Sequence, residues 1–472
     1  MRYPVLLLLA FTLSAVHAQQ AWTLEQCVKH AEEKNLAVLN ASLDAELADR
    51  SRSQARWDLA PNLNGVATHG YNYGRVVDRF TNTFATDRVQ TNNFYLSSTI
   101  SLFEGLRKQG VITQSGIDAD AALKGVEAAR TTVQLDVVQA FLDVVGLRER
   151  ITAAEAQAAS TREQITRTTA LVDAGRLARA DLLALESQLA QEEFTVTDLS
   201  NQRDQRMLAL GRTLQLEPQE MATFDVVAPT IGDMQVSPPT VTADEVMETV
   251  MSKHPAFAQV RMQVESAERS IAIARAGSLP SLTLNGSLGT GYSGRDVRQA
   301  GDPVAGPLQA IGATASGELV YTPTFQYNTE LVPFGVQLDQ NLNQSIGFTL
   351  NVPLFNNMRN RFAIDQARVQ HEKARNSMVS VRNDLQRNVL DALVSQRSAY
   401  KQFVAADRTV EAASLSYEYA QERFNAGVIT SMELATVKAT LNRSTADRIN
   451  AKYQYVMAKK YLEILQGMPV VL

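Results

Sequence analysis

The sequence has one cysteine and few aromatic residues, and both shortages limit what kind of protein it can be. Cys27 is the only cysteine, so no disulfide can form within one chain. It lies on an apolar helical face, where a thiol packs as a small hydrophobe. Aromatic residues make up only 7% of the chain, whereas long stretches are rich in Ala, Gln, Arg, Glu, Leu and Val. Such usage is typical of long helices rather than of several compact cores.

Basic charge is also lacking, because the formal net charge is -5 and only 20% of the residues are charged. Binding to phosphates needs a concentrated basic face, so we expect no nucleic acid as a partner. After residue 18 the sequence has no run of 18 apolar residues. The protein is therefore expected to be periplasmic, secreted, or inserted in a membrane through strands, whose individual signals are weak.

Catalytic and metal-binding constellations are the third kind of absence. The histidines after residue 18 are His30, His69, His254 and His371, scattered along the chain without ligand spacing. The sequence shows neither a phosphate-binding loop nor a nucleophile elbow. We therefore expect no enzyme activity, no bound metal and no cofactor.

The first 18 residues have the three parts of a secretory signal peptide. Arg2 supplies the positive start, residues 5–11 form an apolar core, and Val16, His17 and Ala18 form a cleavage site of mainly small residues. The segment is too short to span a bilayer as a stable helix. Cleavage is expected before Gln19, and no cysteine lies there to carry a lipoprotein anchor.

The rest of the sequence contains two copies of one unit. The first part of each copy corresponds at an offset of 219, which relates residues 23–28 to 242–247 and residues 61–63 to 280–282. Further along the offset is 252, which relates Leu102, Phe103 and Arg107 to Leu354, Phe355 and Arg359. The offsets differ by 33 residues, so the second copy carries that many extra residues within 290–343.

Each copy has the same predicted order of elements. We predict a first repeat at 19–216, a linker at 217–241, a second repeat at 242–467 and a short tail at 468–472. A helix opens each repeat, at 24–60 or 243–279, with Thr23 or Thr242 as its N-cap. Apolar residues then alternate with small or polar ones, which predicts strands at about 63–75 and 92–103, and at about 281–290 and 344–355.

Long helices follow the strands, at 106–171 and 358–424, and return helices at 181–212 and 431–466 close each repeat. A turn containing Gly175 or Gly427 joins the two helices of each copy, which suits a helix C-cap. Two apolar stripes on the long helices indicate neighbours on both sides, as in the wall of a tube. About 65 helical residues reach roughly 100 Å.

Four amphipathic strands cannot close a barrel, because small barrels begin at about eight strands. In lipid an open sheet edge leaves backbone groups unpaired, so the chain is expected to share a barrel with copies of itself. Two copies would give eight strands and three would give twelve. Physical reasoning alone does not choose between them, but the wider trimer leaves a lumen, which suits transport. Trp57, Phe103 and Phe355 lie at helix–strand junctions, where aromatic residues are expected to mark a membrane interface.

The duplicated order, the Leu-Phe followed by Arg at both junctions and the Ala-Gly turns resemble the TolC-like outer-membrane factor (outer membrane efflux protein) family over nearly the whole mature chain. The resemblance implies a mainly α fold with a β-barrel portion, a homotrimer with a shared twelve-stranded barrel, and a periplasmic α-helical tunnel. It also implies location in the outer membrane of a Gram-negative bacterium. The tunnel tip would dock a periplasmic adaptor and an inner-membrane pump, in a tripartite efflux or type I secretion system.

The same resemblance implies that the turns at 172–183 and 424–436 form a gated end. The residues it points to are Gly175, Arg176, Arg179, Asp181, Arg423, Phe424, Gly427 and Glu433. Asp181 and Glu433 match acidic gate positions, whereas Phe424 and Ile429 lack the hydroxyl and the base found in some members. The three arginines could substitute as bases. A plainer alternative is that Asp181 only favours the start of the return helix.

Two questions stay open at this level. A periplasmic coiled-coil adaptor or scaffold would explain the helices, but not the four amphipathic strands. Within the channel interpretation the exported substrate is not specified, since drugs, metals and proteins share one conduit design. The segment at about 290–343 either folds over the barrel mouth or forms a mobile surface loop, and the loop is the slightly favoured expectation.

Overall fold

The computed structural model describes residues 21–86, 88–227, 238 and 242–470. The predicted signal peptide, most of the predicted linker and the last two residues of the predicted tail lie outside the described residues. The chain divides into two compact units. The helical unit contains Met1–Arg50, Gly116–Ser266 and His371–Leu472, and the sheet unit contains Ser51–Ser115 and Ala267–Gln370. Each unit therefore takes residues from both sequence repeats.

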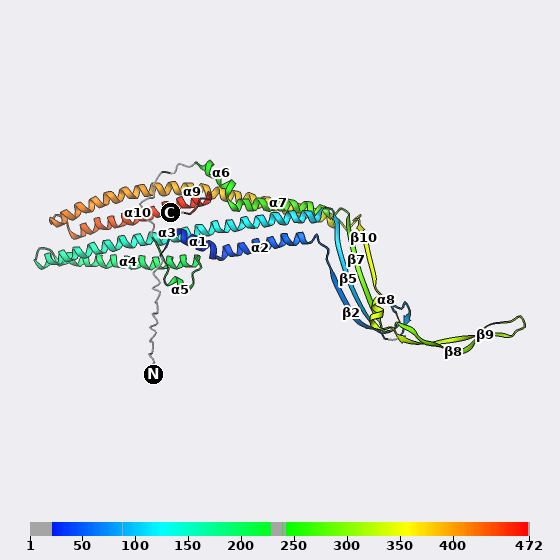
Figure 1. The fold of residues 1–472 in the computed structure, drawn as a ribbon. Helices are drawn as coiled ribbons and strands as arrows, with labels where there is room; N and C mark the ends of the chain where they lie inside the picture. The colour runs from blue at the N-terminus through cyan, green and yellow to red at the C-terminus, as the bar shows by residue number, and fades with distance from the viewer. Residues whose placement is uncertain (1–20, 87, 228–237, 239–241, 471–472) are drawn as a thin grey trace, which may run out of the picture. The chain divides into compact units, whose positions relative to one another are not determined.

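The main helices come in four pairs of equal length (Figure 1). The pairs are α1 (Leu24–Lys34) with α6 (Ala243–Lys253), 11 residues each; α2 (Leu36–Trp57) with α7 (Pro255–Ala276), 22 each; α3 (Arg107–Asp173) with α9 (Arg359–Asn425), 67 each; and α4 (Arg179–Thr213) with α10 (Ser431–Leu465), 35 each. Short helices α5 (Pro218–Met221) and α8 (Phe334–Gln340) add to these. No described helix is both long and apolar enough to cross a membrane.

The single opening helix predicted for each repeat is wrong, because a break divides it. Asn35 and His254 have extended backbones and end α1 and α6. His254 precedes Pro255, whose ring disfavours a helical conformation at the preceding residue. The predicted N-caps are confirmed: Thr23 and Thr242 each accept from a backbone N–H three residues on, within a reciprocal capping box.

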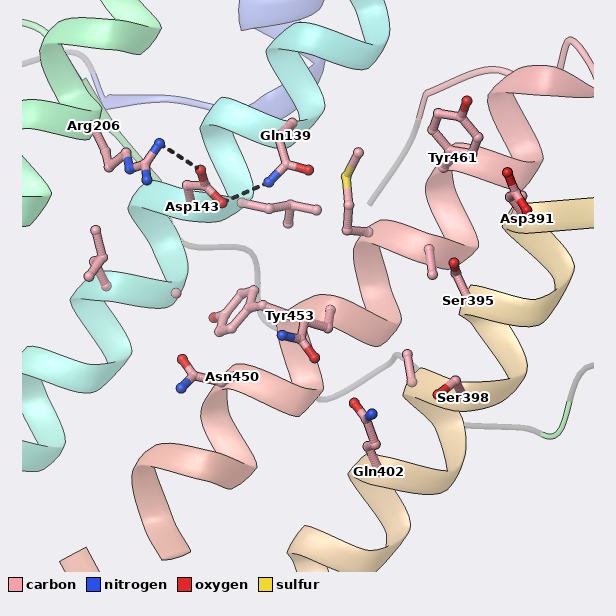
Figure 2. Close-up of a pocket in the computed structure, with 18 of the residues that line it drawn as sticks. Gln139, Asp143, Arg206, Asp391, Ser395, Ser398, Gln402, Asn450, Tyr453 and Tyr461 are labelled. Carbon is pink, nitrogen blue, oxygen red and sulfur yellow. Dashed lines mark hydrogen bonds and ion pairs between the residues drawn. The ribbon is translucent and has the colours of Figure 1, made fainter. Parts of the chain in front are cut away.

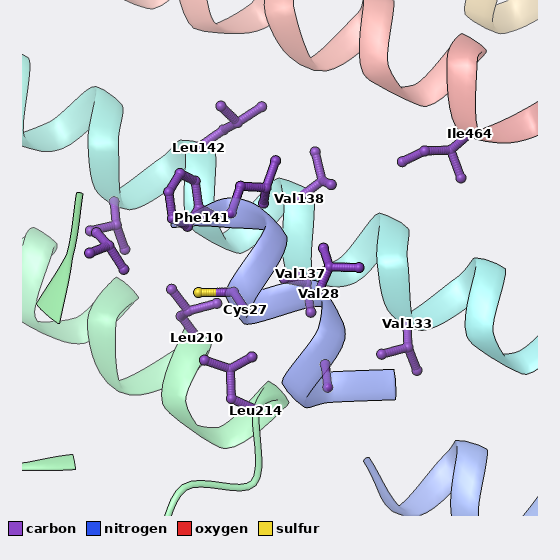
Figure 3. Close-up of a cluster of buried hydrophobic side chains, with 14 of the residues drawn as sticks. Cys27, Val28, Val133, Val137, Val138, Phe141, Leu142, Leu210, Leu214 and Ile464 are labelled. Carbon is purple, nitrogen blue, oxygen red and sulfur yellow. The ribbon is translucent and has the colours of Figure 1, made fainter. Parts of the chain in front are cut away.

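The helical unit has one large core and a smaller counterpart. In the large core the buried side chains of Cys27, Val137 and Leu210 come from α1, α3 and α4 (Figure 3). Burial raises the pKa of the Cys27 thiol to about 12, as expected for a packing residue rather than a reactive one. The smaller core places Val246, Val389 and Leu462 together. These three are the repeat counterparts of the first three, so both copies bury the same helix faces.

The sheet unit is built on four antiparallel strands in the order β10-β7-β5-β2. They are β2 (Asn64–Asn72), β5 (Val89–Glu104), β7 (Ser281–Ser293) and β10 (Asn343–Asn351). β10 stops before the predicted end near 355, because Pro353 has no N–H for a ladder. Two very short strands, β3 (Val76–Val77) and β4 (Phe84–Ala85), pair between β2 and β5 in sequence. In the helical unit β1 (Ala21–Trp22) pairs with β6 (Asp225–Val226).

The strand register confirms that the sheet has one apolar and one polar face. On the apolar face, Leu96 lies opposite Leu288, and Leu284 lies opposite both Ile100 and Phe348. On the other face a polar ladder crosses three strands. Thr99 donates to Asn285 at 3.1 Å, and Asn285 donates to Thr349 at 3.1 Å. A bulge between Ser101 and Phe103 places Phe103, not Leu102 as the simple alternation predicts, opposite Leu282.

Each strand-to-helix junction uses two consecutive residues with positive φ. They are Gly105 and Leu106 after β5, and Asn357 and Met358 after β10. A Cβ atom at Gly105 would come within 2.8 Å of Leu279 Cβ, so this turn needs glycine for space as well as for conformation. Asn tolerates the left-handed region better than most residues, which suits position 357.

The expectation of a surface loop at 290–343 is wrong. The segment contains β8 (Val297–Ala313) and β9 (Leu319–Leu331), which form a separate two-stranded antiparallel ribbon, followed by α8 (Figure 1). Buried hydrogen bonds close its base. The side chain of Gln337 donates to the backbone oxygens of Ser293 and Val332 and accepts from the Ser293 N–H. Asp78 of the first repeat accepts from the Ser293 hydroxyl.

Candidate functional site

The two turns that join the long helices to the return helices have the same backbone. Gly175 has φ of 70° and Gly427 has φ of 73°. In the first turn the N–H of Gly175 bonds to the oxygen of Val172, and the N–H of Arg176 bonds to that of Leu171. Gly427 and the residue after it bond in the same way. This is the Schellman pattern, which satisfies the last carbonyls of a helix through a glycine in the left-handed region.

The helices that leave these turns begin differently. At the start of α10, Thr430 and Glu433 form a reciprocal capping box. The N–H and the hydroxyl of Thr430 both donate to the Glu433 carboxylate, and they lower its pKa. At the corresponding start of α4 the N-cap is Ala178, which makes no side-chain bond. The second turn therefore has its own cap, and the first does not.

This difference leaves the Asp181 side chain available to the other turn. Asp181 occupies the third position of α4, as Glu433 does in α10. Its carboxylate accepts a hydrogen bond from the hydroxyl of Ser431 at 2.5 Å. Ser431 is buried and Asp181 is half-buried. The carboxylate still lies in the first turn of α4, where a negative charge is favourable, so both suggested roles are compatible with its position.

The arginines of the turns are not brought to Asp181. Arg176, Arg179 and Arg423 are exposed, and in the ranges that the structure describes none of them makes an ion pair. Arg423 lies near enough to contribute to the lowered pKa of Glu433. Phe424, at the end of α9, is half-buried. The two glycines and the arginines thus stand on the exposed surface of the turns, and the Asp181–Ser431 bond joins the turns to each other.

A buried charged cluster, missed by the sequence analysis, joins the two helix pairs further along. Lys438 of α10 is 1% exposed and donates to the Thr161 hydroxyl of α3 at 2.5 Å. Thr161 donates to the carboxylate of Glu192 on α4 at 2.5 Å, and the Lys438 ammonium lies 3.8 Å from that carboxylate. Burial lowers the pKa of Lys438, and Glu192 partly opposes the shift.

One signal in the sequence could have revealed this cluster. Leu185, Glu192 and Leu199 follow one another at seven-residue spacing on α4, and all three are buried. The middle position of such an apolar stripe is unusual for a carboxylate, which is rarely fully buried without a partner. No comparable rule identifies Lys438 as that partner, because it lies on another helix far away in sequence.

A groove of about 920 Å³, lined by both polar and apolar side chains, lies along α3, α4, α9 and α10. Figure 2 shows Gln139 and Arg206 directed toward Asp143 at one side. Gln139 donates to Asp143 at 2.8 Å, and the Arg206–Asp143 ion pair is 3.5 Å long. Histidine and cysteine are absent from the described residues that line the groove. The groove offers amide, hydroxyl and carboxylate groups to solvent, without a nucleophile paired with a base.

The three predicted interface aromatics are all exposed on the sheet unit. Trp57 is the last residue of α2, Phe103 lies next to the end of β5, and Phe355 lies between β10 and α9. Trp57 and Phe355 are each 77% exposed. This exposure leaves the rings free to meet a surrounding outside the chain, as an aromatic belt would require. Their role at a membrane interface stays a prediction.

Comparison with known proteins gives a consistent result. A family model described as outer membrane efflux protein matches residues 27–214 and 246–467. Outer membrane protein TolC of Escherichia coli is 23% identical over 470 residues, covering 96% of this chain and 83% of that protein. Alkaline protease secretion protein AprF of Pseudomonas aeruginosa is 23% identical over 451 residues, covering 93% and 83%. The Campylobacter jejuni CmeC outer membrane channel has a similar structure, with a TM-score of 0.74 at 16% identity, covering 94% and 85%.

Proposed function

The chain belongs to the outer membrane efflux protein family, and on this premise we propose that three copies form one export duct through the outer membrane. Members of this family are channel proteins, and the chain is an outer-membrane channel protein of a Gram-negative bacterium. The proposal adds the stoichiometry, the partners and the gate. The alternative of a periplasmic coiled-coil adaptor or scaffold is wrong, since the family model of outer membrane efflux proteins matches residues 27–214 and 246–467.

The four-stranded sheet is the observation that supports the shared barrel. β2 and β10 are its two edge strands, so one chain leaves backbone N–H and C=O groups unpaired along both edges. Leu96, Ile346 and Phe348 are exposed on the apolar face, and the Thr99–Asn285–Thr349 ladder occupies the other. Such a sheet fits a wall with lipid on one side and a water-filled lumen on the other. Three copies give a twelve-stranded closed barrel with a lumen.

The paired turns are the proposed docking and gating end of the duct. Their exposed arginines, Arg176, Arg179 and Arg423, suit a contact with acidic or polar groups of a periplasmic adaptor. The Asp181–Ser431 bond and the buried Lys438–Glu192 pair hold the α9–α10 hairpin against the α3–α4 hairpin in the closed state. Opening requires that the contacts nearest the turns break, and a single half-buried bond suits that task because it contributes only about 1–2 kcal/mol.

The substrate is set by the inner-membrane pump that the duct serves, in either an efflux or a type I secretion system. AprF is named for secretion of an alkaline protease, and BepC of Brucella suis is named an outer membrane efflux protein, which supports leaving both kinds of system open. The groove of Figure 2 offers polar groups without a selective constellation, which suits a conduit.

The test is assembly and conduction by the purified chain. We expect a detergent-solubilised trimer by light scattering, and discrete cation- or anion-conducting steps when it is added to a planar lipid bilayer. A monomer that conducts no current would contradict the proposal. An export assay in cells lacking the partner pump should show loss of export while the trimer persists, which assigns the specificity to the pump.

A further inference from the structure

The two faces of the β8–β9 ribbon differ in polarity, one mainly apolar and aromatic and the other mainly polar. Residues of β9 alternate between its two faces, and the pairing register assigns the β8 residues to the same faces. One face carries mainly apolar side chains, namely Val297, Ala305, Leu308, Ala310, Ala313, Leu319, Tyr321, Pro323, Phe325, Tyr327 and Leu331, with Gln299 and Thr329 as its polar members. The opposite face carries Arg298, Gln309, Thr322, Thr324, Gln326, Asn328 and Glu330, together with Ala300, Val304, Gly312 and Val320.

The apolar face is uncovered in the single chain. Tyr321, Phe325 and Leu319 are 53%, 54% and 57% exposed. A two-stranded ribbon in water is at best marginally stable on its own and has no second layer to bury one face. The rings of Tyr321, Phe325 and Tyr327 are each about half exposed. Together with the neighbouring leucines they offer several hundred Å² of apolar surface, since a fully buried aromatic ring contributes about 150–250 Å². That approaches the roughly 800 Å² that each partner buries in a standard protein interface.

The base of the ribbon is rigid, so its face is presented in a defined direction. Ser293 and Gln337 are fully buried, and Asp78 is 2% exposed. Gln337 joins the two ends of the ribbon through Ser293 and Val332, and Asp78 ties that joint to the first repeat. Val332 also donates its N–H to the Asp296 oxygen at 2.9 Å. A satisfied buried network of this kind limits motion at the base.

The charges on the ribbon argue against a phosphate-bearing lipid surface as the partner. Between 297 and 331 the charged residues are Arg298, Asp302, Glu318 and Glu330. The single arginine is already paired with Glu330 across the strands, at 2.6 Å. The remaining charges are negative, so phosphate groups would be repelled rather than bound. The apolar face of the ribbon is uncharged and rich in aromatic residues. Such a face is suited to packing against the same face of another copy of the chain.

We propose that the apolar face of the β8–β9 ribbon packs against the same face of the ribbons of two other copies. This inference rests on the trimer of the proposed function, because closing the shared sheet brings one ribbon from every copy to the same mouth. Three ribbons with their apolar faces turned inward meet on the common axis. They form a collar of tyrosine, phenylalanine and leucine that narrows the outer opening, as hydrophobic constrictions do in channels that gate by dewetting.

Cysteine cross-linking tests the contact directly. The natural Cys27 is fully buried, so the wild-type chain serves as an unreactive background. Under mild oxidation Y321C and F325C, on the apolar face, should give disulfide-linked pairs of chains on a denaturing gel. The matched controls T322C and Q326C, on the polar face, should remain single chains. Equal cross-linking on both faces, or none on the apolar face, would overturn the inference.

Bilayer conductance tests the collar separately. The triple variant Y321S/F325S/Y327S should raise the conductance of the trimer by at least about twofold, since a polar mouth stays wet. The polar-face variant T322A/T324A/Q326A should leave conductance unchanged. A conducting trimer whose conductance is the same in both variants would refute the collar while the proposed function stands. Failure to form a trimer would instead refute the proposed function. Burial of the F325C thiol by lipid vesicles alone would assign the face to lipid and also overturn the inference.

Discussion

The hydroxyl of Ser431 donates a hydrogen bond to the carboxylate of Asp181 at 2.5 Å, joining two helix turns that lie 250 residues apart in sequence. If this bond holds the gate closed, S431A and D181A should each raise the open-to-closed ratio of the channel. A hydrogen bond to a charged group of this exposure contributes about 1–2 kcal/mol, which corresponds to roughly a five- to thirtyfold change in that ratio. Single-channel recording in planar bilayers measures it.

The double variant separates this bond from general loosening of the turns. S431A/D181A should open no further than either single variant, because each substitution removes the same hydrogen bond. T436A is the control, since among the described residues its hydroxyl donates to the Met432 oxygen, within α10 itself. A tenfold opening by T436A would show that the assay reports helix stability rather than the bond.

A178T should open the gate without removing any group. Threonine at the N-cap of α4 can accept from the Asp181 N–H, and Asp181 can reach back to it as Glu433 does to Thr430. The carboxylate is then drawn away from Ser431, while α4 itself gains about 1 kcal/mol. We expect a higher melting temperature together with a larger open fraction. A higher melting temperature with an unchanged open fraction would exclude Asp181 from the gate.

Removing the charge of Glu192 should destabilise the helical unit strongly. E192Q leaves the Lys438 ammonium buried without a counter-charge, which typically costs about 3–5 kcal/mol. Glu193 is the matched control, because its ion pair with Arg162 is about half exposed on both sides. E193Q should cost less than about 1 kcal/mol. Thermal unfolding followed by circular dichroism compares the two, and E192Q/K438M should recover most of the loss.

The turn glycines are expected to resist substitution although nothing crowds them. Gly175 and Gly427 have open space where a Cβ would lie, so G175A and G427A suffer only from the positive φ, which costs about 1–2 kcal/mol. Gly116 also has open space, but it lies inside α3. G116A should stabilise the protein by about 0.5–1 kcal/mol. Equal effects at all three positions in a melting experiment would contradict the left-handed turn.

His254 makes the stability of the helical unit depend on pH. Burial lowers the pKa of its imidazole below 6.5, so the unfolded chain binds more protons than the folded chain between the two values. The stability is therefore complete above the unfolded pKa and falls as pH drops toward the folded one. H254N introduces the residue found at the corresponding Asn35. Its melting temperature should fall less than that of the wild type between about pH 7.5 and about pH 5.

Most of the helices and strands can be predicted from the sequence, because they follow from patterns that repeat along the chain. Alternation over ten residues predicts a strand face, and the register confirms it for Leu96, Leu284 and Phe348. Local exceptions were missed for local reasons. The bulge at Ser101 adds one residue without any glycine or proline to mark it. The β8–β9 ribbon was missed because prolines and glycines in β8 read as a loop.

The contacts between distant helices could not be predicted. The partner of Asp181 depends on Ala178 lacking a hydroxyl, and on Ser431 being placed beside it by two separate helix hairpins. The approach of Lys438 to Glu192 is set by the same packing. Single-sequence patterns specify which face of a helix is buried, whereas the identity of the neighbour across the interface is a property of the assembled fold.

The unpaired edge strands β2 and β10 affect what happens to a newly exported chain before it assembles. The helices complete their hydrogen bonds within one molecule, so they form at a rate that does not depend on how many copies are present. In the proposed trimer the last ladders of the sheet come from other molecules, and subunit assembly is concentration-dependent. Before assembly, the two unpaired strand edges and the apolar face of the sheet are exposed and can pair with the wrong partner. If the proposed trimer forms, we therefore expect an unassembled chain at low abundance to stay exposed to periplasmic chaperones and proteases for longer than one that is made quickly.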